Sequence, residues 1–354
     1  MATIENDNTI LANPQAVQAA IAADGGEEKA QASDAPGFAY WKKTSRLWPG
    51  LQLAGWAGAL FISLFWPKVQ EVHEVPYQVV LSGVLIFFIV RLMLGRRNRT
   101  LGLKVNHQAQ LYFSISILLA AWDILTAKTN TLLLPFFPGP AQILQVIVED
   151  AKALLTHTYY SLRLLVIGFA GGLSLGLCTG ILMGWYRQWG YWCFPALKII
   201  GVIPATAWIP IAMVAFPSSF HAQIFLIVIC VWFPVAYMTA NGIQNIPNAY
   251  FEAARTLGGD EKFLIFRVAL PAAMPSIFTG IYTATGISFA TLVVSEMVGA
   301  KAGLGFYINW AKGWANYAKV YAAIVIMAVL FSLIMALVYR LRDRTLVWQK
   351  GLLK

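Results

Sequence analysis

Eight long apolar stretches run through this sequence, and they restrict its fold more than any other feature. They lie at approximately 48–66, 75–94, 108–127, 161–186, 194–216, 222–240, 272–294 and 320–339. A helix rises about 1.5 Å per residue, so a stretch of about 20 residues crosses ~30 Å of hydrocarbon. With 58% hydrophobic and 12% charged residues, the chain has too little polar surface for a water-soluble globule. We therefore expect an all-α, polytopic helical membrane protein with about eight transmembrane helices.

The distribution of basic residues predicts the orientation of these helices. The formal net charge is +10. If both termini are cytoplasmic, most lysines and arginines lie on the inner side, and the outer side holds only Lys68, Lys128, Lys152, Lys301, Lys312 and Lys319. This asymmetry is typical of membrane proteins whose basic loops stay inside, so we expect both termini in the cytoplasm. No basic run alternates with exposed aromatic residues, and nucleic acid is therefore not an expected partner.

The segment 241–271 contains a compact set of helix signals. It includes Glu252-Ala253-Ala254-Arg255-Thr256-Leu257-Gly258 and, nine residues later, Val268-Ala269-Leu270-Pro271. Pro247 or Asn248 starts a helix, the alanines favour it, and Gly258 with Gly259 ends it. Asp260 is placed to cap a second short helix that runs to Pro271. We expect two short helices joined at a glycine, which form a knob that fits a groove of another protein.

This spacing resembles the cytoplasmic loop of the permease subunits of ATP-binding-cassette (ABC) importers, although Val268 stands where isoleucine is usual. Within about 111–339, further segments look like the nitrate, sulfonate, taurine and bicarbonate group of these permeases: 203–210 (IPATAWIP), 232–234 (WFP), 270–276 (LPAAMPS), 295–300 (SEMVGA) and 303–305 (GLG). Pro217 departs from the group, in which many members have glycine at this position. The outer end of the span before it is therefore expected to turn differently.

The resemblance implies the role and the partners of the chain. It implies a permease subunit in the bacterial inner membrane that moves a small anionic solute by alternating access, driven by ATP. The chain itself is then no enzyme and holds no cofactor, because ATP and magnesium bind to separate cytoplasmic ATPase subunits. A solute-binding protein outside, membrane lipid and a second copy of the chain are the other expected partners. The residues that couple to the ATPase are then Glu252, Ala253, Ala254, Gly258, Leu270 and Pro271.

The resemblance also divides the chain. Residues 106–340 correspond to the six-helix permease core, with the coupling loop at 241–271, and 341–354 form a basic cytoplasmic tail. Residues 41–105 look like an addition of two transmembrane helices and a basic cytoplasmic loop, with either a structural or a receptor-like role. Residues 1–40 are polar and acidic, so we expect a disordered cytoplasmic tail, with a short amphipathic helix near 14–22 as the alternative.

Five glycines recur at every fourth position of the fourth apolar stretch, at Gly168, Gly172, Gly176, Gly180 and Gly184. They share one helical face and allow another helix to approach closely. We assign this face to helix packing, either within the subunit or across a dimer.

Two groups of residues are candidates for the translocation path. One is a polar stripe within an arc of about 120°, which lines a water-filled route or hydrogen-bonds within the helices: Thr285, Ser288, Thr291 and Ser295. The other is Thr206 and Trp208, which lie between Pro204 and Pro210, where we expect the fifth span to break. These two residues either line the route or pack normally.

Glu296 lies at the outer end of the seventh span. An acidic residue at this depth is energetically expensive and is often functional. The structural alternatives are that it reaches the interface or pairs with Lys301, and we favour the pairing.

Missing motifs exclude several functions. The sequence has no Gly-x-x-x-x-Gly-Lys-Ser/Thr phosphate loop, and neither its 4 histidines nor its 3 cysteines have metal-ligand spacing. We therefore expect no metal site and no nucleotide hydrolysis by this chain alone. The alternative functions are an ion-coupled secondary carrier and a non-transporting membrane enzyme or signalling subunit. The solute itself is not encoded in any motif, because the external binding protein is expected to set selectivity.

Overall fold

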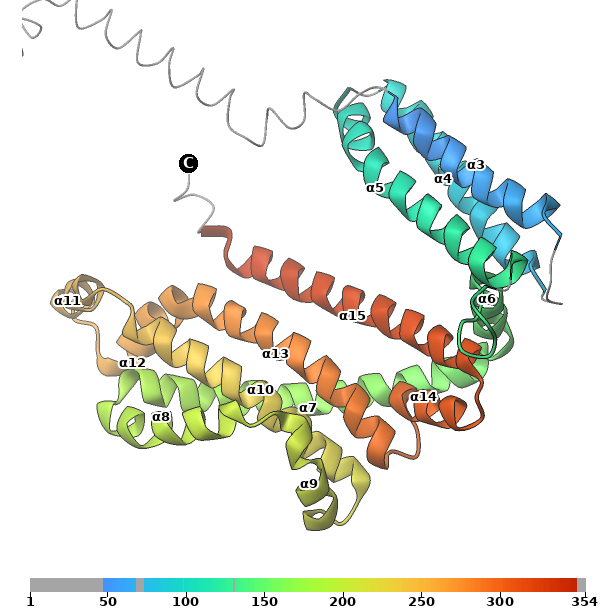
Figure 1. Cartoon of the computed structure of the whole chain (residues 1–354). Helices are drawn as coiled ribbons and strands as arrows, with labels where there is room; N and C mark the ends of the chain where they lie inside the picture. The colour runs from blue at the N-terminus through green and yellow to red at the C-terminus, as the bar shows by residue number, and fades with distance from the viewer. Residues whose placement is uncertain (1–46, 68–72, 98, 130, 349–354) are drawn as a thin grey trace, which may run out of the picture. The chain divides into compact units, whose positions relative to one another are not determined.

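The computed structural model describes residues 47–67, 73–97, 99–129 and 131–348. Within these ranges the chain is almost entirely helical and has no strand, which confirms the all-α prediction. The predicted tail at 1–40 and the last residues of the predicted tail at 341–354 lie outside the described residues. Contacts divide the chain into two compact units, Met1–Thr131 and Leu132–Lys354, each with its own buried core (Figure 1).

In the first unit, three long helices pack against one another. They are α3 (Trp48–Phe65), α4 (Val75–Arg97) and α5 (Arg99–Asp123), and α5 ends in the π-helical turn η1 (Ile124–Lys128). Aromatic rings fill the space between the helices, with ring centroids 5.9 Å apart for Trp56 and Phe88 and 4.8 Å apart for Phe88 and Tyr112. The boundary predicted between residues 105 and 106 falls inside α5, which packs on α3 and α4 within this unit.

The second unit is built around α7, α10 and α13, and α10 packs against both of the others (Figure 1). Its helices are α6 (Pro140–Glu149), α7 (Ala151–Trp185), α8 (Arg187–Val202), α9 (Ile209–Ala215), α10 (Ser219–Gln244), α11 (Asn248–Thr256), α12 (Glu261–Phe263), α13 (Leu270–Gly299), α14 (Leu304–Gly313) and α15 (Tyr317–Thr345). A 3-10 turn, η2 (Ala205–Trp208), precedes α9, and a π-helical turn, η3 (Leu264–Ala269), joins α12 to α13.

The predicted spans correspond to helices of the structure. Among the described residues, 7 helices are long and apolar enough to cross a membrane, and a bent pair gives up to 8. The bent pair is α8 with η2 and α9, which meet at 87°. Because the nitrogen of Pro204 has no hydrogen to donate, the helical hydrogen bonds stop there, and the predicted break in the fifth span is confirmed.

The glycine face of α7 lies against α10 of the same chain. A methyl group added at Gly172 would approach the Cβ of Val231 to 2.6 Å, and one at Gly176 would approach the Cβ of Val235 to 2.8 Å. The other three glycines make the same contact one or two turns away, with Ile227 facing Gly168, Thr239 facing Gly180 and Ile243 facing Gly184. No side chain larger than hydrogen fits between the two helices at these positions. The structure therefore places all five glycines inside the subunit.

Candidate functional site

The helix α11 forms where the loop sequence favours it. Pro247 precedes the helix, and the alanines at 253 and 254 lie in its last turns. Gly258 follows the helix with a φ of +83°, a left-handed conformation that glycine adopts without steric cost. The amide of Gly258 donates to the carbonyl of Arg255 (2.9 Å), and the amide of Gly259 donates to that of Ala254 (2.9 Å). This is a Schellman ending, and it confirms the predicted start and stop of the first short helix.

The second helix of the loop starts as predicted but ends differently. The Oδ1 of Asp260 accepts a hydrogen bond from the amide of Phe263 (2.9 Å), so Asp260 is the N-cap. The prediction of a separate helix ending at Pro271 is wrong. Instead α12 continues through η3 into α13, and the wider π-helical turn accommodates Pro271, the second residue of α13. The loop and the span that follows it are therefore one continuous helical segment, Glu261–Gly299.

The tip of the loop is exposed and carries a large apolar side chain. Leu257 is 89% exposed, and Glu252, Ala253 and Gly258 are also exposed. A methyl group at Gly258 would have no atom within 4 Å. An unpartnered leucine beside a smooth alanine surface is typical of a contact surface for another protein.

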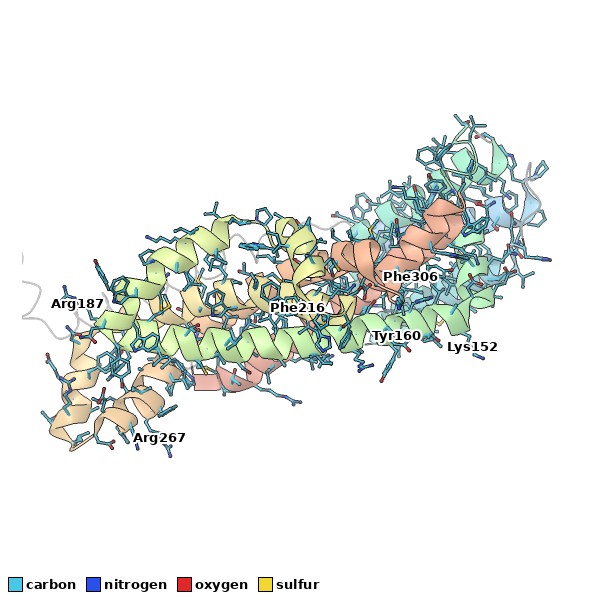
Figure 2. The ribbon with its side chains drawn as sticks, turned by 90° about the horizontal axis from the view of Figure 1, so that it is seen from below. Lys152, Tyr160, Arg187, Phe216, Arg267 and Phe306 are labelled. Atoms are coloured by element: carbon cyan, nitrogen blue, oxygen red, sulfur yellow. The ribbon has the colours of Figure 1, made fainter. Side chains whose placement is uncertain are left out.

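The loop is also braced against the end of α7. The indole nitrogen of Trp185 donates to Glu261 (2.9 Å), and the rings of Trp185 and Phe251 lie 5.6 Å apart, edge to face. A cavity of about 1080 Å³ opens beside this brace and is lined by both elements, among others by Arg187, Gln244, Glu252 and Arg255. Figure 2 shows Arg187 and Arg267 at this end of the unit and Lys152 at the other. Of the other predicted coupling residues, Ala254 and Leu270 are half-buried and Pro271 is exposed.

The broken fifth span places Thr206 and Trp208 in the η2 turn, where both are half-buried. The indole nitrogen of Trp208 is buried without a hydrogen-bond partner among the described residues. The ring packs beside Ile209 and Ala212, which belong to the interface of α9 with α10.

The polar stripe of α13 lies inside the packed unit. All four side chains are at most 2% exposed: Thr285, Ser288, Thr291 and Ser295. The hydroxyl of Thr285 donates to the carbonyl of Ile281 (2.7 Å), that of Ser288 to Thr285 (2.9 Å), and that of Ser295 to Leu292 (2.9 Å). In this structure the stripe therefore does not face a water-filled route. The hydroxyls of Thr285, Ser288 and Ser295 hydrogen-bond within the helix instead, which was the second of the two alternatives.

Glu296, 1% exposed, joins three helices. The hydroxyl of Ser161 in α7 lies 2.7 and 2.9 Å from its two carboxylate oxygens, and the amide of Gly305 in α14 donates to it (2.8 Å). The amide of Leu304 donates to the same Ser161 hydroxyl (2.8 Å). No ion pair joins Glu296 to Lys301, and both residues lie in the described part of the chain, so the predicted pairing is wrong.

Other hydrogen bonds and ion pairs of the structure were not predicted from the sequence. In the second unit, Asp150 accepts from the phenol of Tyr307 (2.7 Å) and pairs with Lys319 (2.5 Å). Burial acts to raise the pKa of Asp150, but the hydrogen bonds from Lys319 and Tyr307 and the charge of Lys319 outweigh it and hold this pKa below its ordinary value. Burial and the nearby Asp150 raise the pKa of Tyr307.

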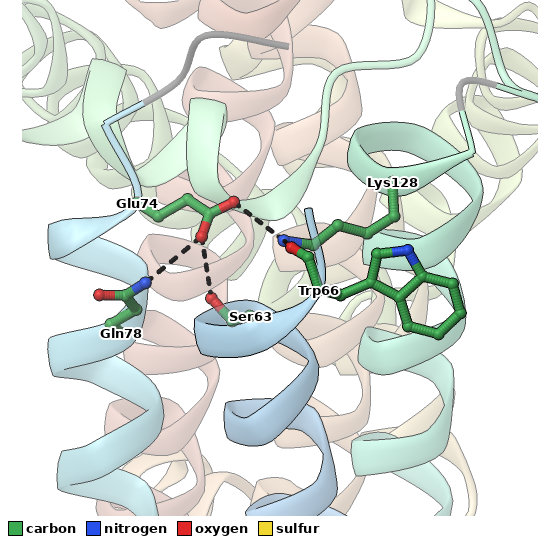
Figure 3. Close-up of polar contacts among 5 residues, drawn as sticks. All are labelled: Ser63, Trp66, Glu74, Gln78 and Lys128. Atoms are coloured by element: carbon green, nitrogen blue, oxygen red, sulfur yellow. Dashed lines mark hydrogen bonds and ion pairs between the residues drawn. The ribbon is translucent and has the colours of Figure 1, made fainter. Parts of the chain in front are cut away.

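In the first unit, Lys128 and Glu74 form a buried ion pair (3.2 Å) whose side chains are 0% and 3% exposed. Lys128 also donates to the carbonyl of Trp66 (3.1 Å), while Ser63 and Gln78 donate to Glu74 (both 3.3 Å), as Figure 3 shows. The sequence interpretation had placed Lys128 among the outer surface charges. The sequence gives no sign of these contacts, because residues that lie far apart in the chain follow no common helical spacing.

The family model described as "Binding-protein-dependent transport system inner membrane component" matches residues 172–347. The chain is similar to the bicarbonate transport system permease protein CmpB of Synechococcus elongatus, 37% identical over 44% of this chain and 57% of that protein. It is also similar to the nitrate import permease protein NrtB of Synechocystis sp., 30% identical over 55% of this chain and 74% of that protein. Among solved structures it is similar to the MetNI methionine ABC transporter in an inward-facing conformation, with a TM-score of 0.47 and 21% identity over 56% of this chain and 98% of that chain. The match spans less than two thirds of the bicarbonate permease.

Proposed function

This chain belongs to the binding-protein-dependent inner membrane transport components, the permeases of ABC importers, and on that premise we propose that it moves a small anion by alternating access. The anion belongs to the nitrate, bicarbonate, taurine or sulfonate class. Two of the relatives are named for nitrate and bicarbonate, which supports this class. The chain is a multi-pass membrane protein, and its partners in this proposal are cytoplasmic ATPase subunits, an external solute-binding protein and a second copy of itself.

One observation carries the proposal: the exposed knob at Glu252–Gly258 is joined by the turn at Gly258 and Gly259 to a helical segment that continues into a membrane span, and α11 packs against η3 of that segment. The ATPase, which binds ATP and magnesium, grips this knob, and closure of the ATPases displaces it. Because α11 packs against η3, and α12, η3 and α13 form one helical segment, a displacement of the knob is passed to α13 and so to the interior of the unit. This coupling requires that the ATPase binds one state of the permease more tightly than the other.

The route itself is assigned to the broken fifth span. Thr206 and Trp208 lie where the backbone leaves the α-helix, and interrupted helices border the route in many transporters. The polar stripe of α13 contributes to this route only when α13 separates from its neighbours, because its hydroxyls are buried in the present state. A Thr206→Val variant is expected to slow uptake without affecting capture of the ATPase.

The coupling role is tested by copurification of the tagged permease with its ATPase. Gly258→Trp places a large ring on the contact surface, and the captured ATPase is expected to fall by about 10-fold or more, as at a binding hot spot. Gly258→Asn distinguishes the effect of side-chain size from the effect of backbone strain. Asparagine tolerates the positive φ of this position better than other residues with side chains. Gly313→Trp is the matched control, since this exposed glycine also has no atom within 4 Å of an added methyl group. Undiminished capture by Gly258→Trp would contradict the coupling role.

The solute class is tested by uptake of labelled nitrate, bicarbonate, taurine and an alkyl sulfonate into proteoliposomes that contain the complex and its binding protein. ATP-dependent uptake of one of these anions is the expected result. Uptake that continues without ATP would instead favour the ion-coupled carrier.

A further inference from the structure

The carboxylate of Glu296 lies at the end of α13 opposite the coupling loop. Resting on the proposed transport function, we propose that Glu296 is a positioning residue that makes α14 move together with α13. The motion that the ATPase applies at one end of α13 then reaches the surface formed by α14 at the other. Figure 2 labels Phe306 of α14 and Tyr160 of α7 in this region, where the rings of Phe306 and His157, which also belongs to α7, lie 5.9 Å apart.

The bonding around Glu296 connects separate helices rather than neighbours in one helix. Its partners are the hydroxyl of Ser161, 135 residues away, and the amide of Gly305 at the start of α14. Ser161 in turn accepts from the amide of Leu304 (2.8 Å). These bonds satisfy amide donors in the first turn of α14, which have no partner inside their own helix. The first turn of α14 is therefore held by side chains of α13 and α7 and not by a cap of its own.

The glycines before and within α14 make this contact possible. Gly303 has a φ of +124°, and an added methyl group there would collide with the carboxylate of Glu296. At Gly305, the methyl group would lie 2.7 Å from the Cβ of Glu296 and 2.5 Å from the carbonyl of Val293. The structure thus explains the two glycines of the segment Gly303-Leu304-Gly305: they allow the backbone at the start of α14 to lie against Glu296 near the end of α13.

Stability alone is a weak reason to bury this carboxylate. Taking a charged group out of water costs several kcal/mol per ion in general, and apolar side chains of similar volume often stabilise a protein as well. Hydrogen bonds, by contrast, fix one relative placement of the helices that share them. The 30 residues of α13 span about 45 Å at 1.5 Å per residue, so a rigid tie at its far end transmits a displacement across the membrane.

A second bond between α13 and α14 provides a matched comparison. The side-chain amide of Asn309 donates to the carbonyl of Met297 (2.9 Å), but this residue is exposed. Water replaces such a bond when it is removed, whereas it does not reach Glu296. Asn309→Ala is therefore expected to leave the movement of α14 unchanged.

The experiment measures distances between spin labels in the complex of the permease with its ATPase. The native Cys178, Cys193 and Cys230 are replaced by alanine. One label pair joins Gln188→Cys in α8 to Lys312→Cys in α14, and a reference pair joins Gln188→Cys to Ile287→Cys in α13; all three positions are exposed. Each pair is measured without nucleotide and with ATP plus vanadate.

In the wild type, both pairs are expected to shift when nucleotide binds. In Glu296→Ala, and more weakly in Ser161→Ala, the shift of the α14 pair is expected to fall by about threefold or more while that of the α13 pair persists. A purely structural role would change both pairs together or neither, and either result would overturn the proposal, as would an α14 label that does not shift in the wild type. If the α13 pair itself does not shift in the wild type, the proposed transport motion fails rather than the tie alone. Ser161→Ala keeps the test decisive if Glu296→Ala does not fold.

Discussion

Glu74 and Glu296, two of the buried carboxylates among the described residues, are balanced in different ways. Glu74 in the first unit faces a cation, Lys128, at 3.2 Å, whereas Glu296 in the second unit faces a hydroxyl and a backbone amide. Removing one partner of an ion pair strands a charge in a low-dielectric interior, whereas removing a neutral donor leaves only an unsatisfied hydrogen bond. The first arrangement closes three helices of one unit, and the second joins helices that we propose move together. We infer that a charged partner holds a buried carboxylate where helices form a fixed bundle. Neutral hydrogen-bond donors hold the carboxylate that links helices proposed to move together.

The largest effect is expected at the ion pair. Lys128→Ala strands the charge of Glu74 and is expected to lower the free energy of unfolding by about 3–5 kcal/mol. Thermal unfolding in detergent measures this loss. Removing both charges, with Lys128→Met and Glu74→Gln together, should restore most of it, and a double variant as unstable as the single one would contradict the explanation.

A smaller loss is expected at Glu296. Glu296→Gln keeps one acceptor oxygen and strands no cation, so the free energy of unfolding should fall by about 2 kcal/mol. The same unfolding measurement applies, with Glu149→Gln on the exposed side of α6 as the control. A loss equal to that of Lys128→Ala would remove the distinction between the two carboxylates.

Substitution of Ser161, the hydrogen-bond partner of Glu296, is expected to lower the free energy of unfolding by less than Glu296→Gln does. Ser161→Ala removes a hydroxyl that binds the carboxylate and the amide of Leu304, and hydrogen bonds between membrane helices are worth about 1 kcal/mol. Thr156→Ala is a suitable control, because this exposed hydroxyl bonds only to its own helix. Equal losses in the two variants would mean that the buried bond has no special strength.

Asp150 is a third carboxylate, half-buried and held by both a cation and a phenol, and its effect should be the smallest. Its pKa is lower in the folded protein than in the unfolded chain, so its stabilising contribution is complete above the ordinary aspartate pKa and is lost as the pH falls through the folded value. We therefore expect wild-type stability to drop in acid more steeply than that of Asp150→Asn. Parallel unfolding profiles below neutral pH would contradict this assignment.

Local signals in the sequence predicted local structure well. The apolar stretches located the spans because length and hydropathy act segment by segment, and Pro204 marked the break because the missing N–H acts within one turn. Gly258 and Asp260 predicted the ends of the loop helices for the same reason.

Features that depend on distant partners were not predictable in this way. Glu296 was noticed, but Lys301 was its expected partner because it is close in sequence, whereas Ser161 is 135 residues away. The Glu74–Lys128 pair was missed because each residue alone resembles an ordinary charge at a span end. The continuity of α12 with α13 was hidden because Pro271 usually marks a boundary, and the π-helical turn that accommodates it has no sequence signal of its own.

That turn has a consequence for the surface that the loop presents. A π-helical turn holds about one residue more than an α-helical turn, which amounts to an insertion that rotates everything before it by roughly 100° about the axis. Deleting one residue between Leu264 and Ala269 would restore a regular helix and swing Phe263 and the preceding loop to another azimuth, with the span itself unchanged. The direction in which the knob faces thus depends on the one extra residue that the π-helical turn contains.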